Sequence, residues 1–172
     1  GDIVYTVTRE SDLGMNIPES PLRSQGIGKA FQKARAMGSD EIAVGDFTPY
    51  APSGGKPAGF MMAQMRTENG SLVGYVAFQM PLDRINKIML QRDGMGKTGE
   101  SYLVGQDKLM RSDSYLDPEG HSVAASFKNN TTVDTEAVRE ALAGGENEKV
   151  ISDYNGNPVL SCWDAVDLGS GV

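Results

Sequence analysis

The chain has 172 residues, enough for one ordinary domain or two small ones with a hydrophobic core. Its formal net charge of -7 argues against a nucleic-acid partner, because phosphates require clusters of lysine and arginine. No apolar run approaches the length of a membrane span, and the N-terminus lacks a signal-peptide pattern. The single cysteine, Cys162, excludes an internal disulfide, and its apolar surroundings predict a buried, unreactive thiol.

The first half of the chain predicts a strand, a helix and a further strand in that order. Residues 2–10 are β-branched and aromatic, which indicates a strand. Apolar residues then recur at i, i+3, i+4 and i+7, which predicts one face of a helix ending near Gly38. These residues are Ile27, Ala30, Phe31 and Ala34. Residues 41–47 predict the next strand.

A β-hairpin is predicted next, with strands at 59–65 and 72–80 around Asn69-Gly70, a strong short hairpin signal. A helix with one apolar face follows. That face consists of Leu82, Ile85, Ile88 and Met89.

Residues 94–101, "GMGKTGES", invite comparison with a phosphate-binding loop. Gln91 stands where the first glycine of that motif is required. The context is also reversed, because a phosphate loop follows a strand and enters a helix. We interpret the stretch as a glycine-rich helix stop, and we expect no nucleotide ligand.

The second half predicts strands at 101–105 and 108–114 around a turn at Gln106-Asp107. Residues 135–143 predict a helix that is capped by Asp134 and stops at Gly144. Strands at 149–154 and 158–166 then flank a second Asn-Gly turn. His121 lies in a polar stretch and is expected at the surface.

The two halves repeat several features in the same order, which suggests tandem modules. Each has a helix ending at glycine, then an acid beside an aromatic residue, then Gly-x-Pro before an apolar strand. The paired features are Gly38 and Gly144, Asp46-Phe47 and Asp153-Tyr154, and residues 55–57 and 156–158.

The sequence resembles the extracytoplasmic region of bacterial methyl-accepting chemotaxis proteins, which is a double Cache (PAS-like) sensor. The resemblance is carried by "PLDRINKIML", "GMGKTGESYLVGQDKLMRSDSYLDPEGHSVAASF", "TVDTEAVREALAG" and "ISDYNGNPVLS". It implies an α+β fold of two modules, each an antiparallel sheet with helical cover. Residues 1–80 would form the membrane-distal module, 81–97 a connecting helix and turn, and 98–172 the membrane-proximal module.

The resemblance also implies a sensor facing the periplasm, flanked by transmembrane helices that this chain does not include. The distal module would lack its first strand and N-terminal helix, and the proximal module its last strand. The intact receptor would be a homodimer without a cofactor. The ligand would be a small molecule such as an amino acid, a carboxylate or an amine.

A ligand site in the first module can be predicted from the two faces of the hairpin. The face with Met61, Ala63, Met65, Val76 and Phe78 is almost wholly apolar, and we assign it to the core. The mixed face combines aromatic and polar side chains, as a pocket wall does. With the loop that could cover it, the predicted ligand-binding residues are Asp46, Tyr50, Phe60, Gln64, Tyr75 and Gln79.

In the second module, the turn at Gln106-Asp107 is expected to place Tyr102 opposite Arg111. Arg111 could bind a ligand carboxylate with two hydrogen bonds, or it could pair with Asp113 or Asp153.

Three functions remain open for the chain. It could be a non-enzymatic sensor on a chemotaxis receptor, a histidine kinase or a cyclase. It could also be a module that binds a periplasmic protein, or a hydrolase with Asp46 or Asp153.

Overall fold

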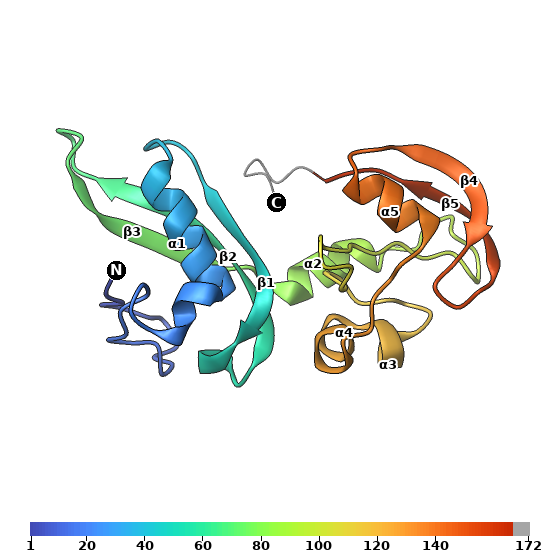
Figure 1. The fold of residues 1–172 in the computed structure, drawn as a ribbon, viewed down its shortest axis with the longest axis horizontal. Coiled ribbons are helices and arrows are strands. Elements are labelled where there is room, and N and C mark those ends of the chain that lie inside the picture. Colours follow the sequence, from blue (N-terminus) through green and yellow to red (C-terminus); the bar gives the residue numbers. More distant parts are fainter. Residues whose placement is uncertain (167–172) are drawn as a thin grey trace. The chain divides into compact units, whose positions relative to one another are not determined.

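The structure is a computed structural model, and it describes residues 1–166. These residues form two compact units, the first ending at Pro81 and the second beginning at Leu82 (Figure 1). The first unit contains a three-stranded antiparallel sheet, and the second contains a two-stranded antiparallel sheet and most of the helices. The predicted α+β class is therefore confirmed.

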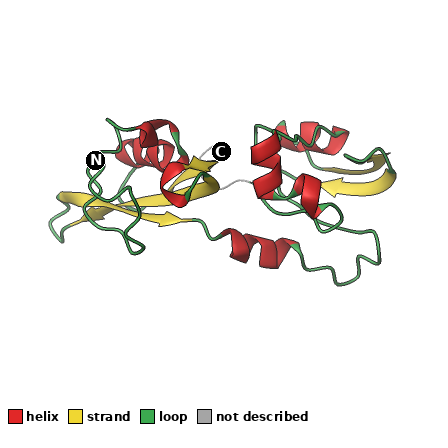
Figure 2. Ribbon diagram, turned by 90° about the horizontal axis from the view of Figure 1, so that it is seen from below, coloured by secondary structure: helices red, strands yellow, loops and turns green. Residues whose placement is uncertain are grey.

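The first unit is built around one helix on one face of its sheet, as Figure 2 shows. Its elements are the 3-10 turns η1 (Pro21–Ser24) and η2 (Ala51–Ser53), helix α1 (Gly26–Ala36), and strands β1 (Ala43–Tyr50), β2 (Lys56–Arg66) and β3 (Leu72–Gln79). The strand order is β1-β2-β3, so β1 and β3 form the edges.

Helix α1 packs its predicted apolar face on the sheet, because Ile27, Ala30, Phe31 and Ala34 are all buried. The approach is close enough to require glycine at position 45. A Cβ on Gly45 would lie 1.9 Å from the carbonyl oxygen of Gly26. The Thr48 hydroxyl accepts a 2.7 Å hydrogen bond from the Gly26 amide, which fixes the start of the helix on β1.

The register predicted for the first hairpin is confirmed. Phe60 pairs with Gln79, and Gln64 pairs with Tyr75. Residues 67–71 connect the strands, the Thr67 amide donates to the Ser71 carbonyl oxygen, and Gly70 has φ 80. The register shifts between Met65 and Arg66, just before this turn.

The strand predicted at residues 2–10 is wrong. Only a single bridge between Asp2 and Asn16 forms there, and the Ile3 amide and carbonyl bond back to Met15 and Gly14. A β-branched sequence makes a strand only where a neighbouring strand pairs with it. Val4 and Val7 are accordingly exposed.

The second unit contains several short helices and one hairpin. Its elements are helices α2 (Leu82–Met89), α3 (Pro118–His121), α4 (Val123–Asn129) and α5 (Glu136–Leu142), and strands β4 (Asn147–Ser152) and β5 (Pro158–Trp163). The helices α3 and α4 were not predicted. Their N-caps are Asp117 and Ser122, whose side chains accept backbone hydrogen bonds from Gly120 and Ala125.

The strands predicted at 101–105 and 108–114 are wrong, although the turn at Gln106-Asp107 forms. A single bridge joins Val104 to Met110. Next to this bridge, serine hydroxyls take the place of further backbone acceptors. The Ser112 hydroxyl accepts from the Leu103 amide, and the Ser126 hydroxyl accepts from the Met110 amide.

The end of α5 follows prediction and its start does not. Gly144, at φ 83, donates to Ala141, and Gly145 donates to Glu140, which is a Schellman C-cap. The N-cap is Thr135, which accepts from the Val138 amide, and not Asp134.

The closing hairpin forms as predicted, with β4 and β5 paired in one register around Asn155-Gly156. Cys162 lies on β5 and is exposed, so the expectation of a buried thiol is wrong. Successive strand residues face opposite sides of a two-stranded sheet, and Cys162 falls on the uncovered side.

Residues 94–99 form the predicted glycine-rich turn after α2. Gly94 and Gly96 have positive φ, and the Arg92 guanidinium donates to the carbonyl oxygens of Gly96 and Gly99. Across residues 1–166, no helix has both the length and the apolar character that crossing a membrane demands.

Candidate functional site

The two faces of the first hairpin are the reverse of the prediction. The face with Phe60 and Met62 is the core side, where both side chains are buried beneath α1. The opposite face leaves Phe78 62% exposed and Met65 44% exposed. We name the set Met61, Ala63, Met65, Val76 and Phe78 the outer face.

Three of the predicted ligand-binding residues have structural partners on the core side. The Tyr50 side chain is buried and donates a 2.6 Å hydrogen bond to Asp12. The Gln64 amide donates to the carbonyl oxygens of Ala34 and Met37 at the end of α1. Tyr75 packs edge-on against Phe31, with ring centroids 5.0 Å apart. These contacts occupy the face predicted as a pocket wall.

Phe60 belongs to the same core, where it packs edge-on against Tyr50. The remaining two first-unit candidates lie outside that core. Asp46 is half-buried where β1 shifts register, and its Oδ1 accepts from the Phe47 amide at 2.7 Å. Gln79 is exposed at the end of β3. Ligand contact by any of the six residues stays a prediction.

The second-unit candidates, Tyr102 and Arg111, are not opposite each other. The Arg111 amide donates to Leu103, so the pairing is shifted by one residue from the prediction. The Arg111 guanidinium is buried, forms a 2.9 Å ion pair with Asp107 and lies over the Phe127 ring. These contacts give Arg111 a structural role beside the turn.

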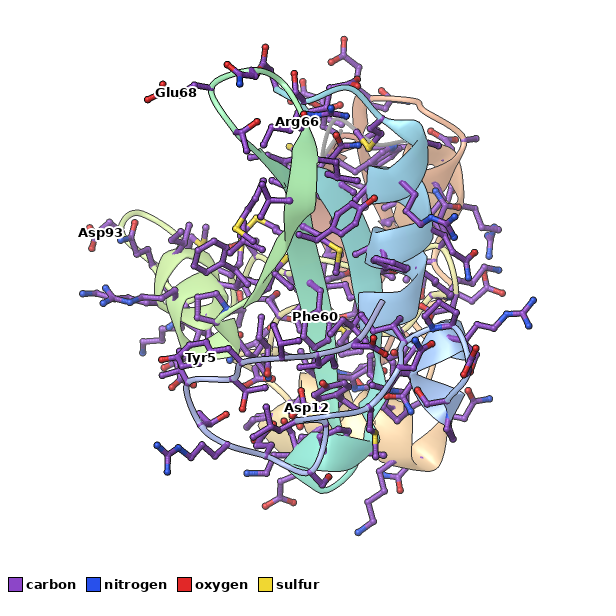
Figure 3. All side chains as sticks on the ribbon, turned by 90° about the vertical axis from the view of Figure 1, so that its left-hand side faces the viewer. Tyr5, Asp12, Phe60, Arg66, Glu68 and Asp93 are labelled. Carbon is purple, nitrogen blue, oxygen red and sulfur yellow. The ribbon has the colours of Figure 1, made fainter. Side chains whose placement is uncertain are left out.

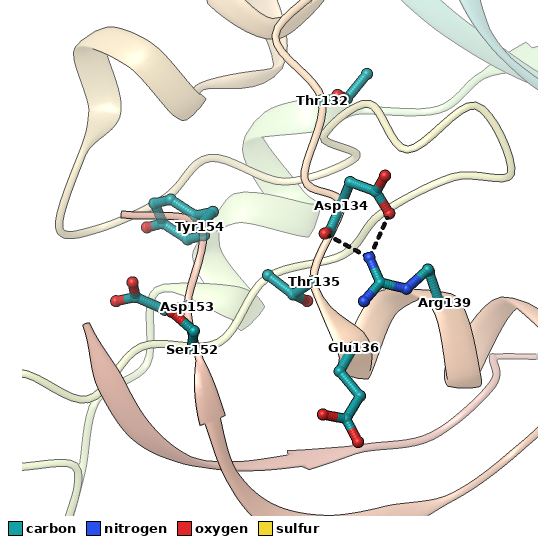
Figure 4. A pocket seen from close by; sticks show the side chains of 8 residues that line it. All are labelled: Thr132, Asp134, Thr135, Glu136, Arg139, Ser152, Asp153 and Tyr154. Atoms are coloured by element: carbon teal, nitrogen blue, oxygen red, sulfur yellow. Dashed lines mark hydrogen bonds and ion pairs between the residues drawn. The ribbon is translucent and has the colours of Figure 1, made fainter. Parts of the chain in front are cut away.

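A pocket of about 500 Å³ opens between the start of α5 and the end of β4. Figure 4 shows residues 152–154 on one side of it and residues 134–139 on the other. Most of its walls are hydroxyl and charged groups. The lining residues are Thr132, Asp134, Thr135, Glu136, Arg139, Ser152, Asp153 and Tyr154.

Ion pairs fix the charged wall of the pocket. Asp134 lies 2.8 Å from Lys108 and 3.0 Å from Arg139. These hydrogen bonds, first from Lys108 and then from Arg139, lower the pKa of the Asp134 carboxyl. Glu136 bonds Lys149 at 2.6 Å and raises the pKa of that lysine. Arg139 is therefore held in position in the lining of the pocket.

Tyr154 connects the pocket to a network of hydrogen bonds centred on Glu100. The Tyr154 hydroxyl donates to Glu100 Oε1 and lies 2.9 Å from the Ser114 hydroxyl. The other oxygen, Oε2, accepts from Ser114 and from the Tyr115 and Leu116 amides. Burial, and then the bond to Glu100, raise the pKa of Tyr154.

His121 lies against the ring of Tyr154, with ring centroids 4.2 Å apart. It is 8% exposed, so the expectation of a surface histidine is wrong. Its Nδ1 lies 2.7 Å from Asp117 Oδ2, and this hydrogen bond lowers the pKa of the Asp117 carboxyl. The contacts hold one side of Tyr154 while the Glu100 network holds its hydroxyl.

The same residues do not form a serine–histidine pair. Such a pair needs a hydroxyl bonded to a histidine nitrogen that can accept its proton. The Ser114 hydroxyl donates to Glu100, and the His121 ring bonds Asp117 instead. The arrangement positions Tyr154 and Ser114 without placing a histidine nitrogen on the serine.

Sequence reasoning missed the pocket residues because they come from separate segments. The sequence indicated Asp153 as part of a repeat, as a possible partner of Arg111 and as a hydrolase candidate, and it indicated Tyr154 only in the repeat. The predicted ligand residue Tyr102 lies next to this group, since its ring packs edge-on against Tyr154 at 5.6 Å. No protein-family model matches the chain, and no curated protein or solved structure is significantly similar to it.

Proposed function

We propose that the chain is a non-enzymatic sensor region that binds a small molecule and belongs to a membrane-bound chemotaxis receptor facing the periplasm. The observation that carries the binding role is the polar pocket of the second unit, in which Tyr154 is held by the Glu100 network. The resemblance of residues 81–161 to chemotaxis-receptor sensors supports the choice of receptor class.

The pocket suits a small polar ligand. Its volume of about 500 Å³ is in the usual range for small-molecule sites. Its hydroxyls and the Arg139 guanidinium supply donors and acceptors in several directions. A ligand bridging Tyr154 and Arg139 would couple the turn after β4 to the start of α5. Such a ligand shifts the equilibrium between two conformations of the chain only to the extent that its affinities for the two differ.

A thermal-shift screen with amino acids, carboxylates, amines and purines tests this proposal. A saturating ligand, at a hundred times its Kd, is expected to raise the Tm by about 5–10 °C, because it binds only the folded state. Tyr154→Phe and Arg139→Gln are expected to weaken that ligand about tenfold each.

Tyr115→Phe is the matched control, since it also deletes a phenol hydroxyl but lies outside the pocket lining. It should bind like the parent. The proposal fails if no compound class raises the Tm, or if the affinity survives both pocket substitutions.

A second candidate function, binding of a periplasmic protein, is favoured by the outer face. Phe78 is 62% exposed there and lies beside the half-buried Met61 and Val76. Contiguous exposed apolar side chains mark protein interaction surfaces.

In this case an immobilised chain should retain a periplasmic binding protein, and Phe78→Asp should abolish retention. Quantitative mass spectrometry of the bound fraction measures this. Tyr154→Phe should retain the same protein, so the two candidate functions are separable. Equal retention by Phe78→Asp would exclude the outer face.

A further inference from the structure

The first unit contains a buried carboxylate with an unpartnered oxygen. Asp12, labelled in Figure 3, is 7% exposed and lies beside Tyr50 at the end of β1. Its Oδ2 accepts the 2.6 Å hydrogen bond from Tyr50. Its Oδ1 has no hydrogen-bond partner within residues 1–166. Leaving a buried carboxylate oxygen unpaired is costly, so this atom calls for a donor.

A second carboxylate accompanies it. Both oxygens of Glu10 accept from the Ser53 hydroxyl, at 3.2 and 3.0 Å. The pKa of the Tyr50 phenol is raised, first by burial and then by its hydrogen bond to Asp12. The negative charges of Asp12 and Glu10 raise it further. The two acids and two hydroxyls thus gather at one end of the sheet.

This group has no cation of its own. Within the described chain, neither Glu10 nor Asp12 forms an ion pair with lysine, arginine or histidine. Buried acids are ordinarily matched by a positive group. The surroundings of Asp12 therefore favour a ligand that brings both a positive charge and an N–H donor.

We propose that Asp12, assisted by Glu10, binds the primary ammonium group of a small organic molecule. An ammonium carries three N–H donors, one of which can satisfy Asp12 Oδ1 and another Glu10. Asp12 belongs to a loop, so entry requires loop movement and leaves the sheet intact.

A metal ion fits this group less well. Calcium takes six to eight oxygen ligands. Residues 1–166 contain no cluster of three or more His, Cys, Asp or Glu side chains able to hold a metal. The ammonium site lies in the first unit and stands independently of the pocket at Tyr154.

The test uses the whole chain with methylammonium chloride as the probe. Methylammonium is expected to raise the Tm with increasing concentration, whereas tetramethylammonium at equal ionic strength, which lacks N–H donors, is not. Asp12→Asn should weaken methylammonium about tenfold, because it removes a charge-assisted hydrogen bond. Asp40→Asn, which changes an exposed acid of the same unit, should bind like the parent.

Glu10→Gln keeps the test decisive if Asp12→Asn fails to fold, since Glu10 is only half-buried and should also weaken the probe. Three results overturn the inference: no Tm rise with methylammonium, an equal rise with both salts, or a rise that survives Glu10→Gln and Asp12→Asn alike. A buried water would then be the partner of Oδ1. Such a failure leaves the sensor proposal standing wherever a screened compound binds in a Tyr154-dependent way.

Discussion

Replacing Phe31 by alanine is expected to lower the free energy of unfolding by about 3–5 kcal/mol, as large-to-small changes in a core do. Phe31 is 5% exposed in the cluster between α1 and the sheet. Its ring packs edge-on against Tyr75, and the Arg35 guanidinium lies 5.8 Å from its centroid. Urea unfolding, with the midpoint and slope fitted together, measures the loss.

Phe78→Ala is the matched control, because the same atoms are removed from a side chain that is 62% exposed. It is expected to cost less than about 1 kcal/mol. If Phe78→Ala proved the more destabilising of the two, the outer face would be the core side of the sheet.

The register of the first hairpin was predictable because local chemistry determines it. Asn69-Gly70 supplies a residue that tolerates positive φ, and the alternation of side chains specifies which strand residues pair. The helix face Ile27-Ala30-Phe31-Ala34 was predictable for the same reason, since its period needs only one segment.

The sequence did not predict which face of the first hairpin packs against the core, because both faces carry large apolar residues. Met61 and Phe78 are as apolar as Met62 and Phe60, so composition alone chose the wrong side. What decides is the docking of α1, which brings Phe31 onto Tyr75 and needs Gly45 beneath it. Gln64 joins the core side because the last carbonyls of α1 need a donor.

Helices α3 and α4 had a usable sequence signal. Asp117-Pro118 is an N-cap followed by proline at the first helical position, and Ser122 is a second N-cap. The Glu100 network had none. Its members Glu100, Ser114 and Tyr154 are 14, 40 and 54 positions apart pairwise, and hydrogen bonds over such separations leave no periodic pattern.

For the predicted site residues, the sequence likewise identified the residue but not its distant contacts. Tyr102 lies beside Tyr154 because the chain folds back after β4, and Tyr50 reaches Asp12 across 38 positions of sequence. Residue type identified these tyrosines as candidates. Their partners, which decide what the tyrosines do, come from loops that sequence reasoning left without a role.

Raising the pH from 10 to 12 is expected to destabilise the protein by about 2 kcal/mol through Tyr102 alone. Burial, followed by the negative charges of Glu100 and Asp153, raises the pKa of Tyr102 to about 12 from the ordinary 10.0. Over this interval the unfolded chain loses the phenolic proton at a lower pH than the folded chain does. The unfolded state therefore binds fewer protons, and the free energy of unfolding falls as the pH rises.

Tyr102→Phe removes this contribution, so its stability should fall less steeply over the same interval. The variant keeps part of the alkaline loss, because the pKa of Tyr154 is raised as well. Urea unfolding at pH 9, 10, 11 and 12 (about one-unit steps spanning both ionisations) measures the slope. Tyr5→Phe, from a side chain 77% exposed, should match the parent. A parental slope in Tyr102→Phe would mean that the Tyr102 phenol ionises as readily in the folded chain as in the unfolded one, and that Glu100 and Asp153 do not act on it.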